Sequence, residues 1–151
     1  MNSIIEQKSF QFAVRIVNLC KHLRNAKKEH ILSKQLLRSG TSIGANTAEA
    51  QQAQSKADFI SKLSIALKET TETKYWLNLL QATDYLLKQN FTPYSLTALR
   101  LRRYWSQSLR LSRNKNKFSI FNFQFLIKKD ALHLQRIFVF TLRIPQPWFP
   151  G

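Results

Sequence analysis

The distribution of proline limits the first 90 residues of this chain to a mostly helical fold. All four prolines lie beyond residue 90, and the whole chain contains only three glycines. Because these two residues are the strongest helix breakers, long helices can run through this part without interruption. A chain of 151 residues is also long enough to form one domain with a buried core. The sequence therefore predicts an all-α body.

Apolar residues recur at helical spacing in three segments, and they predict helices over about 9–26, 31–53 and 55–88. Ser33 and Ser55 are suited to cap the second and third of these helices, because a serine hydroxyl accepts a hydrogen bond from a free backbone N–H. The predicted core positions follow one another at steps of three and four: Phe12, Ile16, Leu19 and Leu23 in the first helix, and Phe59, Leu63, Ala66, Thr70, Thr73, Leu77 and Leu80 in the third.

Small residues crowd the second predicted helix. Gly40 and Gly44 are four positions apart and share a face, with Thr47 and Ala48 next along it. Glycine inside a helix costs about 1 kcal/mol relative to alanine, so this face predicts a neighbouring helix whose backbone comes close. No Gly-Lys-Ser/Thr follows the glycines, which argues against a phosphate-binding loop.

The second and third helices are expected to pack antiparallel, because only a few residues near Gln54 can form the turn between them. Residues whose numbers add to about 110 then lie side by side. This register predicts an ion pair between Arg38 and Glu72, and it also places Glu49 near Lys62.

The chain is strongly basic, with a formal net charge of +16. Residues 1–96 hold 13 Lys+Arg and 7 Asp+Glu, whereas residues 97–151 hold 11 Lys+Arg and one acid. Such a chain attracts phosphate polyanions or anionic membrane surfaces. The cations at the end of the first helix also complement its macrodipole, which is the simpler interpretation of them. As nucleic-acid contacts we predict Lys21, Arg24, Lys27, Lys28 and Lys34.

Residues for catalysis or metal binding are not arranged in any recognisable way. His22, His30 and His133 have no ligand spacing, and the carboxylates of residues 1–96 form no apolar-flanked pair. The single cysteine, Cys20, lies in an apolar helical run and is expected to be a buried free thiol. We therefore expect no enzyme activity, no metal and no cofactor. The sequence has neither a signal-peptide pattern nor an apolar run long enough to span a membrane, so we expect a cytoplasmic protein.

Two runs of the sequence point to a family. SFQFAVRIVNLCKHL and LSKQLLRSGTSIGANTAEAQQAQSKADFISKLSIALKETTETKYWLNLL closely resemble the four-helix-bundle proteins of the 23S rRNA intervening-sequence family. This family includes relatives of the accessory variability protein of diversity-generating retroelements. The resemblance covers about residues 8–96. It implies an antiparallel up-and-down four-helix bundle that assembles as a homopentamer, has no enzyme activity and associates with structured RNA or a reverse transcriptase.

The resemblance stops after FTPYSL, so we divide the chain into a helical body at 1–96 and a basic, aromatic-rich tail at 97–151 that replaces the fourth helix and is poorly ordered in part. We hypothesise that a frameshift produced this tail, because the genetic code permits a family-like fourth helix in the neighbouring reading frame. A stop codon in that frame before the Lys117 codon would rule the hypothesis out. The alternatives are an RNA-binding arm, with arginines for phosphates and Tyr104 and Trp105 for stacking, or a basic membrane-surface segment.

The predicted function is that of a non-enzymatic helical-bundle scaffold. It self-assembles and binds structured RNA, or a partner associated with RNA, through its basic surface. A protein-interaction module without direct RNA contact is the first alternative, and a nonfunctional frameshifted remnant is the second. No small-molecule substrate is expected.

Overall fold

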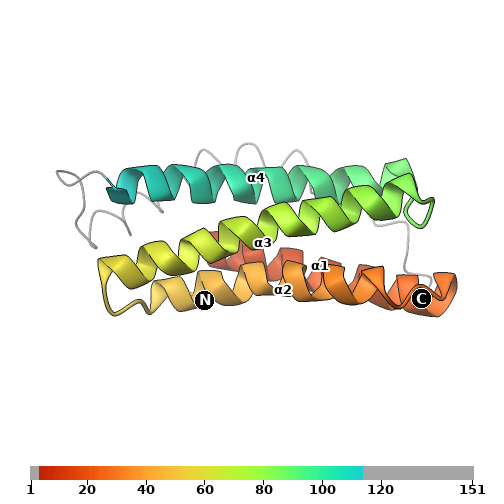
Figure 1. The fold of residues 1–151 in the computed structure, drawn as a ribbon, viewed down its shortest axis with the longest axis horizontal. Helices are drawn as coiled ribbons and strands as arrows, with labels where there is room; N and C mark the ends of the chain where they lie inside the picture. The colour runs from red at the N-terminus through yellow and green to blue at the C-terminus, as the bar shows by residue number, and fades with distance from the viewer. Residues whose placement is uncertain (1–3, 114–151) are drawn as a thin grey trace.

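The computed structural model describes residues 4–113, which form four helices and no strand (Figure 1). Each helix runs antiparallel to the one before it, and short turns join them (Figure 1). This arrangement confirms the predicted all-α, up-and-down four-helix bundle. The bounds are α1 Ile4–Lys27, α2 Leu32–Gln51, α3 Lys56–Ala82 and α4 Lys88–Arg113.

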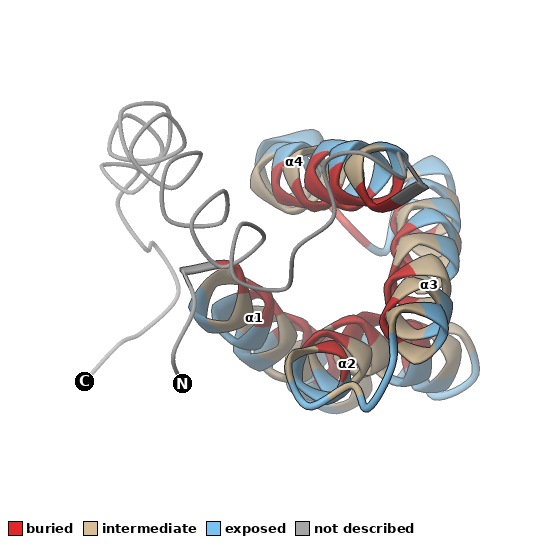
Figure 2. Ribbon diagram, turned by 90° about the vertical axis from the view of Figure 1, so that its left-hand side faces the viewer, coloured by how far each residue is buried: buried red, intermediate tan, exposed pale blue. Residues whose placement is uncertain are grey.

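The four helices follow one another around a common core, but the first and the last of them pack only loosely against each other. Packing is extensive between α1 and α2, between α2 and α3, and between α3 and α4, whereas α1 and α4 make few contacts with each other. Seen along the bundle, α1 and α4 are the two ends of an arc, and the buried faces of all four helices point inward (Figure 2). The largest side chains that this core buries almost completely are Trp105, Phe12, Ile16, Leu23, Leu36, Ile43, Leu63, Leu77, Leu80 and Leu101.

The first and third helices differ in length from the sequence prediction. Helix α1 begins at Ile4 rather than near residue 9, because Ile5 continues its apolar seam and is buried. Helix α3 ends at Ala82 rather than near residue 88. The chain turns at Asp84, which has a φ of 59°, and the Leu86 N–H then donates to the Leu80 carbonyl at 3.0 Å. Neither glycine nor proline marks this turn, so the sequence offered no signal for it.

The largest correction concerns the segment after Leu96. Residues 97–113 belong to α4, so this part of the chain forms the fourth helix instead of replacing it with a tail. Its apolar residues recur at steps of three and four, which is sufficient to build a helix with one face in the core. The buried members of that face are Ala98, Leu101, Trp105 and Leu109. The rest of the predicted tail, residues 114–151, lies outside the described residues.

The small-residue face of α2 packs against α1. A Cβ added to Gly40 would lie 2.7 Å from Ile16 Cγ2, which is too close, so the two helices approach each other here as only glycine allows. At Gly44 the nearest atom would be the Ser9 carbonyl oxygen at 3.5 Å, an ordinary contact. Thr47 is buried and donates to the Ile43 carbonyl, but Ala48 is exposed and does not share this packing.

Polar side chains connect α2 to α3 in the register expected from the sequence. Arg38 Nη2 lies 3.3 Å from Glu72 Oε1, and Lys62 pairs with Glu49. Deeper in the same interface, the Thr73 hydroxyl donates to Ser39 Oγ at 3.1 Å. At the start of α3, Ser55 Oγ accepts the N–H of Asp58 at 3.1 Å, which is the N-cap that the sequence predicts.

One cationic side chain joins the loosely packed helices α1 and α4. The Arg15 guanidinium lies 4.7 Å from the centre of the Tyr94 ring, and its Nη1 donates to Thr97 Oγ1 at 3.4 Å. Desolvation by burial raises the pKa of Tyr94 despite the nearby Arg15 charge, so its phenol is neutral and its ring is available for a cation–π contact.

Candidate nucleic-acid interface

The predicted nucleic-acid contacts lie in the turn between α1 and α2 and on the two helices that flank it, and this turn is built around Glu29. Lys28 adopts a left-handed conformation with a φ of 53°, and the Glu29 N–H then donates to the Leu23 carbonyl at 3.0 Å. The Glu29 carboxylate accepts three backbone N–H groups at the start of α2, from Ile31 at 2.8 Å, Leu32 at 2.7 Å and Ser33 at 2.6 Å. Glu29 is therefore the cap of α2, in place of the predicted Ser33.

The capping contacts determine the charge state of Glu29. Burial alone would raise its pKa, but the backbone hydrogen bonds from Leu32, Ser33 and Ile31 outweigh that effect and hold the pKa below its usual range. Glu29 is thus ionised at neutral pH, although only 7% of its surface is exposed. Its negative charge points at the positive end of the α2 dipole rather than at solvent.

Ser33 links this cap to the end of α1. Its hydroxyl donates to the Glu29 carbonyl at 2.9 Å and receives a hydrogen bond from Arg24 Nε at 3.4 Å. The Cys20 thiol donates to the Ser33 carbonyl at 3.2 Å. Desolvation raises the pKa of Cys20 to about 12, so the thiol stays protonated and unreactive. These contacts hold the turn in one conformation.

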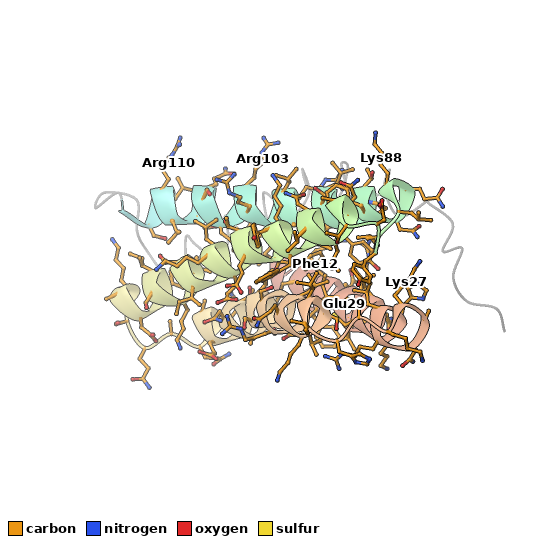
Figure 3. The ribbon with its side chains drawn as sticks, turned by 45° about the vertical axis from the view of Figure 1, so that its right-hand side comes forward. Phe12, Lys27, Glu29, Lys88, Arg103 and Arg110 are labelled. Atoms are coloured by element: carbon orange, nitrogen blue, oxygen red, sulfur yellow. The ribbon has the colours of Figure 1, made fainter. Side chains whose placement is uncertain are left out.

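The five predicted phosphate contacts divide into two groups. Lys21, Lys27, Lys28 and Lys34 are exposed around the turn, whereas Arg24 is half-buried and hydrogen-bonded to Ser33. Figure 3 shows Lys27 projecting from the end of α1 near Glu29. The structure therefore leaves the four lysines available to a ligand and assigns Arg24 a role in holding the turn.

A second group of exposed cations lies on α4, which the sequence prediction treated as an aberrant tail. Arg102, Arg103 and Arg110 are exposed, as is Lys88 at the start of the helix. Figure 3 shows Lys88, Arg103 and Arg110 projecting from the side of α4 that faces away from the other helices. The absence of any carboxylate between Asp84 and Asp130 was the available sequence signal for this face.

Tyr104 and Trp105 do not lie on this basic face. Trp105 is completely buried, and Tyr104 is 9% exposed and packs edge-on against it with ring centres 5.0 Å apart. The aromatic stacking that an RNA-binding arm would require is therefore unavailable, because both rings belong to the core. Within residues 4–113, Trp105 Nε1 also has no hydrogen-bond partner.

Over the described part of the chain, no group of three or more His, Cys, Asp or Glu residues could hold a metal ion. None of the four helices is long and apolar enough to cross a membrane, as judged over residues 4–113.

Comparison with known proteins identifies the family. The sequence matches the 23S rRNA-intervening sequence proteins over residues 1–107, which is more than half of the chain. The chain belongs to this family. The match extends past Leu96, so the prediction that the resemblance stops there is wrong, and it includes the first part of the apolar face of α4. No functionally curated protein matches the sequence.

A solved structure supports the same relationship. A protein of unknown function from the S23 ribosomal protein family of Bacteroides thetaiotaomicron is 50% identical to this member of the 23S rRNA-intervening sequence family. The similarity covers 71% of the present chain and 99% of the Bacteroides protein, with a TM-score of 0.70. The two proteins therefore share their fold over nearly the full length of the Bacteroides chain.

Proposed function

We propose that this protein is a non-enzymatic, self-associating helical scaffold that binds structured RNA through the α1–α2 turn. The observation that carries the proposal is the orientation of Glu29. This carboxylate lies within the turn, yet its charge is directed into the α2 backbone. Neither the Arg38–Glu72 nor the Lys62–Glu49 ion pair involves the four exposed lysines. The turn and the adjoining parts of α1 and α2 therefore present Lys21, Lys27, Lys28 and Lys34 with their charge uncompensated by Glu29.

Such a surface binds by neutralising phosphates. Lysine ammonium groups act as point charges on flexible stems, so they favour phosphate contacts over readout of base edges. Counterion release then makes the affinity strongly dependent on salt and only weakly dependent on sequence. Membership of a family named after an rRNA intervening sequence fits such a ligand.

The test is a salt titration of binding to a structured RNA. Replacing Lys21 and Lys34 with glutamine should weaken binding about tenfold per lost contact at about 50 mM salt, and it should lower the slope of log affinity against log salt by about 2. The matched control replaces Lys68 and Lys74 of α3 with glutamine, which changes the net charge equally. Equal effects of the two pairs would contradict the assignment of this surface, and no binding by the unaltered chain would favour a protein-interaction module.

The self-association part of the proposal is supported by α1. Phe10 and Val14 are 51% and 43% exposed and lie one turn apart on the same side of the helix, where a second copy could cover them. The family resemblance implies a pentamer. Light scattering should give a mass several times the 17.7 kDa of one chain, and the mass of a single chain would exclude the assembly.

A further inference from the structure

The outer face of α4 is a second cationic surface, separate from the α1–α2 turn. Its exposed cations are Lys88, Arg102, Arg103 and Arg110. In Figure 3, Lys88, Arg103 and Arg110 project away from the bundle, on the opposite side of α4 from Lys27 at the end of α1 and Glu29 in the turn that follows. One ligand contact therefore cannot account for both surfaces.

The charge of this face is not neutralised from within its own helix. Helix α4 contains no aspartate or glutamate over its 26 residues. The carboxylate that precedes it most closely in the sequence is Asp84, in the turn after α3. A surface with only one sign of charge raises the local concentration of anions of the opposite sign.

The arginines of this face are held at a defined spacing. Arg103 and Arg110 are seven residues apart, which corresponds to about 10.5 Å along the helix axis and to nearly the same side of the helix. On the opposite side of the same turns, Leu101, Trp105 and Leu109 are buried in the core. The backbone that carries the guanidinium groups is therefore anchored, while their planar forks remain free to make paired hydrogen bonds with phosphate oxygens.

The surroundings of the arginines restrict the kind of ligand. A single-stranded nucleic acid gains affinity by stacking its bases on exposed aromatic rings, but Tyr104 and Trp105 are buried. A membrane-surface helix inserts its apolar face into lipid, but the apolar face of α4 is occupied by the core. A nucleic-acid duplex requires neither exposed aromatic rings nor a free apolar helix face, because it presents its phosphates outward in regular rows.

We propose that the outer face of α4 binds the phosphate backbone of double-stranded RNA, with Arg103 and Arg110 as its central contacts. This inference rests on the proposed function and assigns the class of RNA that the protein prefers. The two basic surfaces would allow one copy of the protein to contact two RNA segments, or two parts of one folded RNA.

The experiment measures binding of the full chain to an RNA duplex, to a single strand of the same length and to phosphatidylserine vesicles. The chain is expected to bind the duplex most tightly. Replacing Arg103 and Arg110 with glutamine should reduce duplex affinity about tenfold per contact at about 50 mM salt and lower the salt slope by about 2. The Lys68→Gln, Lys74→Gln pair is the control with the same change in net charge.

A charge-preserving pair, Arg103→Lys with Arg110→Lys, should retain the salt slope and lose part of the affinity, because lysine cannot form the bidentate contact. Unchanged duplex binding by the glutamine pair would overturn the proposal, as would binding to the single strand or the vesicles as tight as to the duplex. The two proposals can fail separately. If Arg103→Gln with Arg110→Gln loses binding but Lys21→Gln with Lys34→Gln does not, only the assignment of the α1–α2 surface is overturned. If the lysine variant loses binding but the arginine variant does not, only the assignment of the α4 surface is overturned.

Discussion

The interface between α1 and α2 and the interface of α4 with the rest of the bundle are built in different ways. The first depends on close fit and on buried polar contacts: Gly40 against Ile16, Cys20 donating to Ser33, and Glu29 capping α2. The second depends mainly on buried volume, provided by residues such as Leu101 and Trp105. Trp105 even leaves its indole N–H without a partner among the described residues.

This difference shows how much sequence information each interface requires. A helix with apolar residues at steps of three and four can occupy the position of α4, whatever its detailed sequence. The α1–α2 hairpin accepts far fewer sequences, because a glycine, a carboxylate and a serine must each stand at one position. The fit of α4 to the bundle is therefore compatible either with a frameshifted origin of residues 97–113 or with a selected one.

The largest expected effect is the loss of buried volume in α4. Replacing Trp105 with alanine should lower the free energy of unfolding by about 3–5 kcal/mol, because a large, fully buried side chain leaves a cavity. Replacing it with phenylalanine should cost only about 1–2 kcal/mol, since this change also removes the unpartnered indole N–H. Chemical denaturation measures both values. Equal losses in the two variants would show that Trp105 is held by a specific contact rather than by volume.

Next in size is the removal of the α2 cap. Replacing Glu29 with alanine should cost about 2–3 kcal/mol, because three backbone N–H groups lose a charged acceptor. The contribution of Glu29 should also depend on pH. Since its pKa is lowered in the folded state, the stability it adds is present above the unfolded pKa of about 4.3 and is lost as the pH falls through the folded value.

Urea denaturation at a series of pH values tests this dependence, with Glu29→Gln as the variant that cannot titrate. The stability difference between the unaltered protein and Glu29→Gln should be largest near neutral pH and should shrink below about pH 4. A difference that stays constant down to about pH 2 would contradict the assignment of the acid-sensitive cap to Glu29.

The smallest expected changes in stability come from replacing the two glycines of α2, and they should have opposite signs. Gly40→Ala should destabilise the protein by about 1–2 kcal/mol, because the new methyl group would overlap the side chain of Ile16, which is completely buried. Gly44→Ala should stabilise it by up to about 1 kcal/mol through helix propensity, because a Cβ there makes only ordinary contacts. Thermal unfolding of the two variants provides the comparison. Stabilisation by both would mean that α1 and α2 are not held as closely as the structure shows.

The sequence was sufficient to predict the elements whose signals are local. The apolar periodicity predicts the helices, and the short turn near Gln54 predicts the register that brings Arg38 beside Glu72. It was insufficient where the signal depends on the tertiary structure. The side chain that caps α2 belongs to Glu29, two residues before the N-cap position Ile31, where sequence rules expect a serine or a similar residue. The end of α3 relies on Asp84 in a left-handed conformation.

The candidate site was predictable only in part, for the same reason. Charge clustering identified the lysines of the α1–α2 turn, but it could not separate Arg24, which bonds to Ser33, from its exposed neighbours. The arginines of α4 lie in the segment that the sequence assigns to a tail. Apolar spacing permits a helix there, with Arg102 and Arg103 opposite Leu101, Trp105 and Leu109, and the structure forms that helix as far as Arg113.

The contact of Arg15 with Tyr94 and Thr97 has a consequence for the order in which the bundle opens. Helix α4 packs extensively against α3 alone, and Arg15 joins its first turns to α1. Because its contacts with α1 are few, we expect α4 to open at a lower free energy than the α1–α2 hairpin. We expect the molecule to consist of two cooperative units that differ in their free energy of opening. Amide protons of α4 should therefore exchange with solvent well before those of α2 around Gly40.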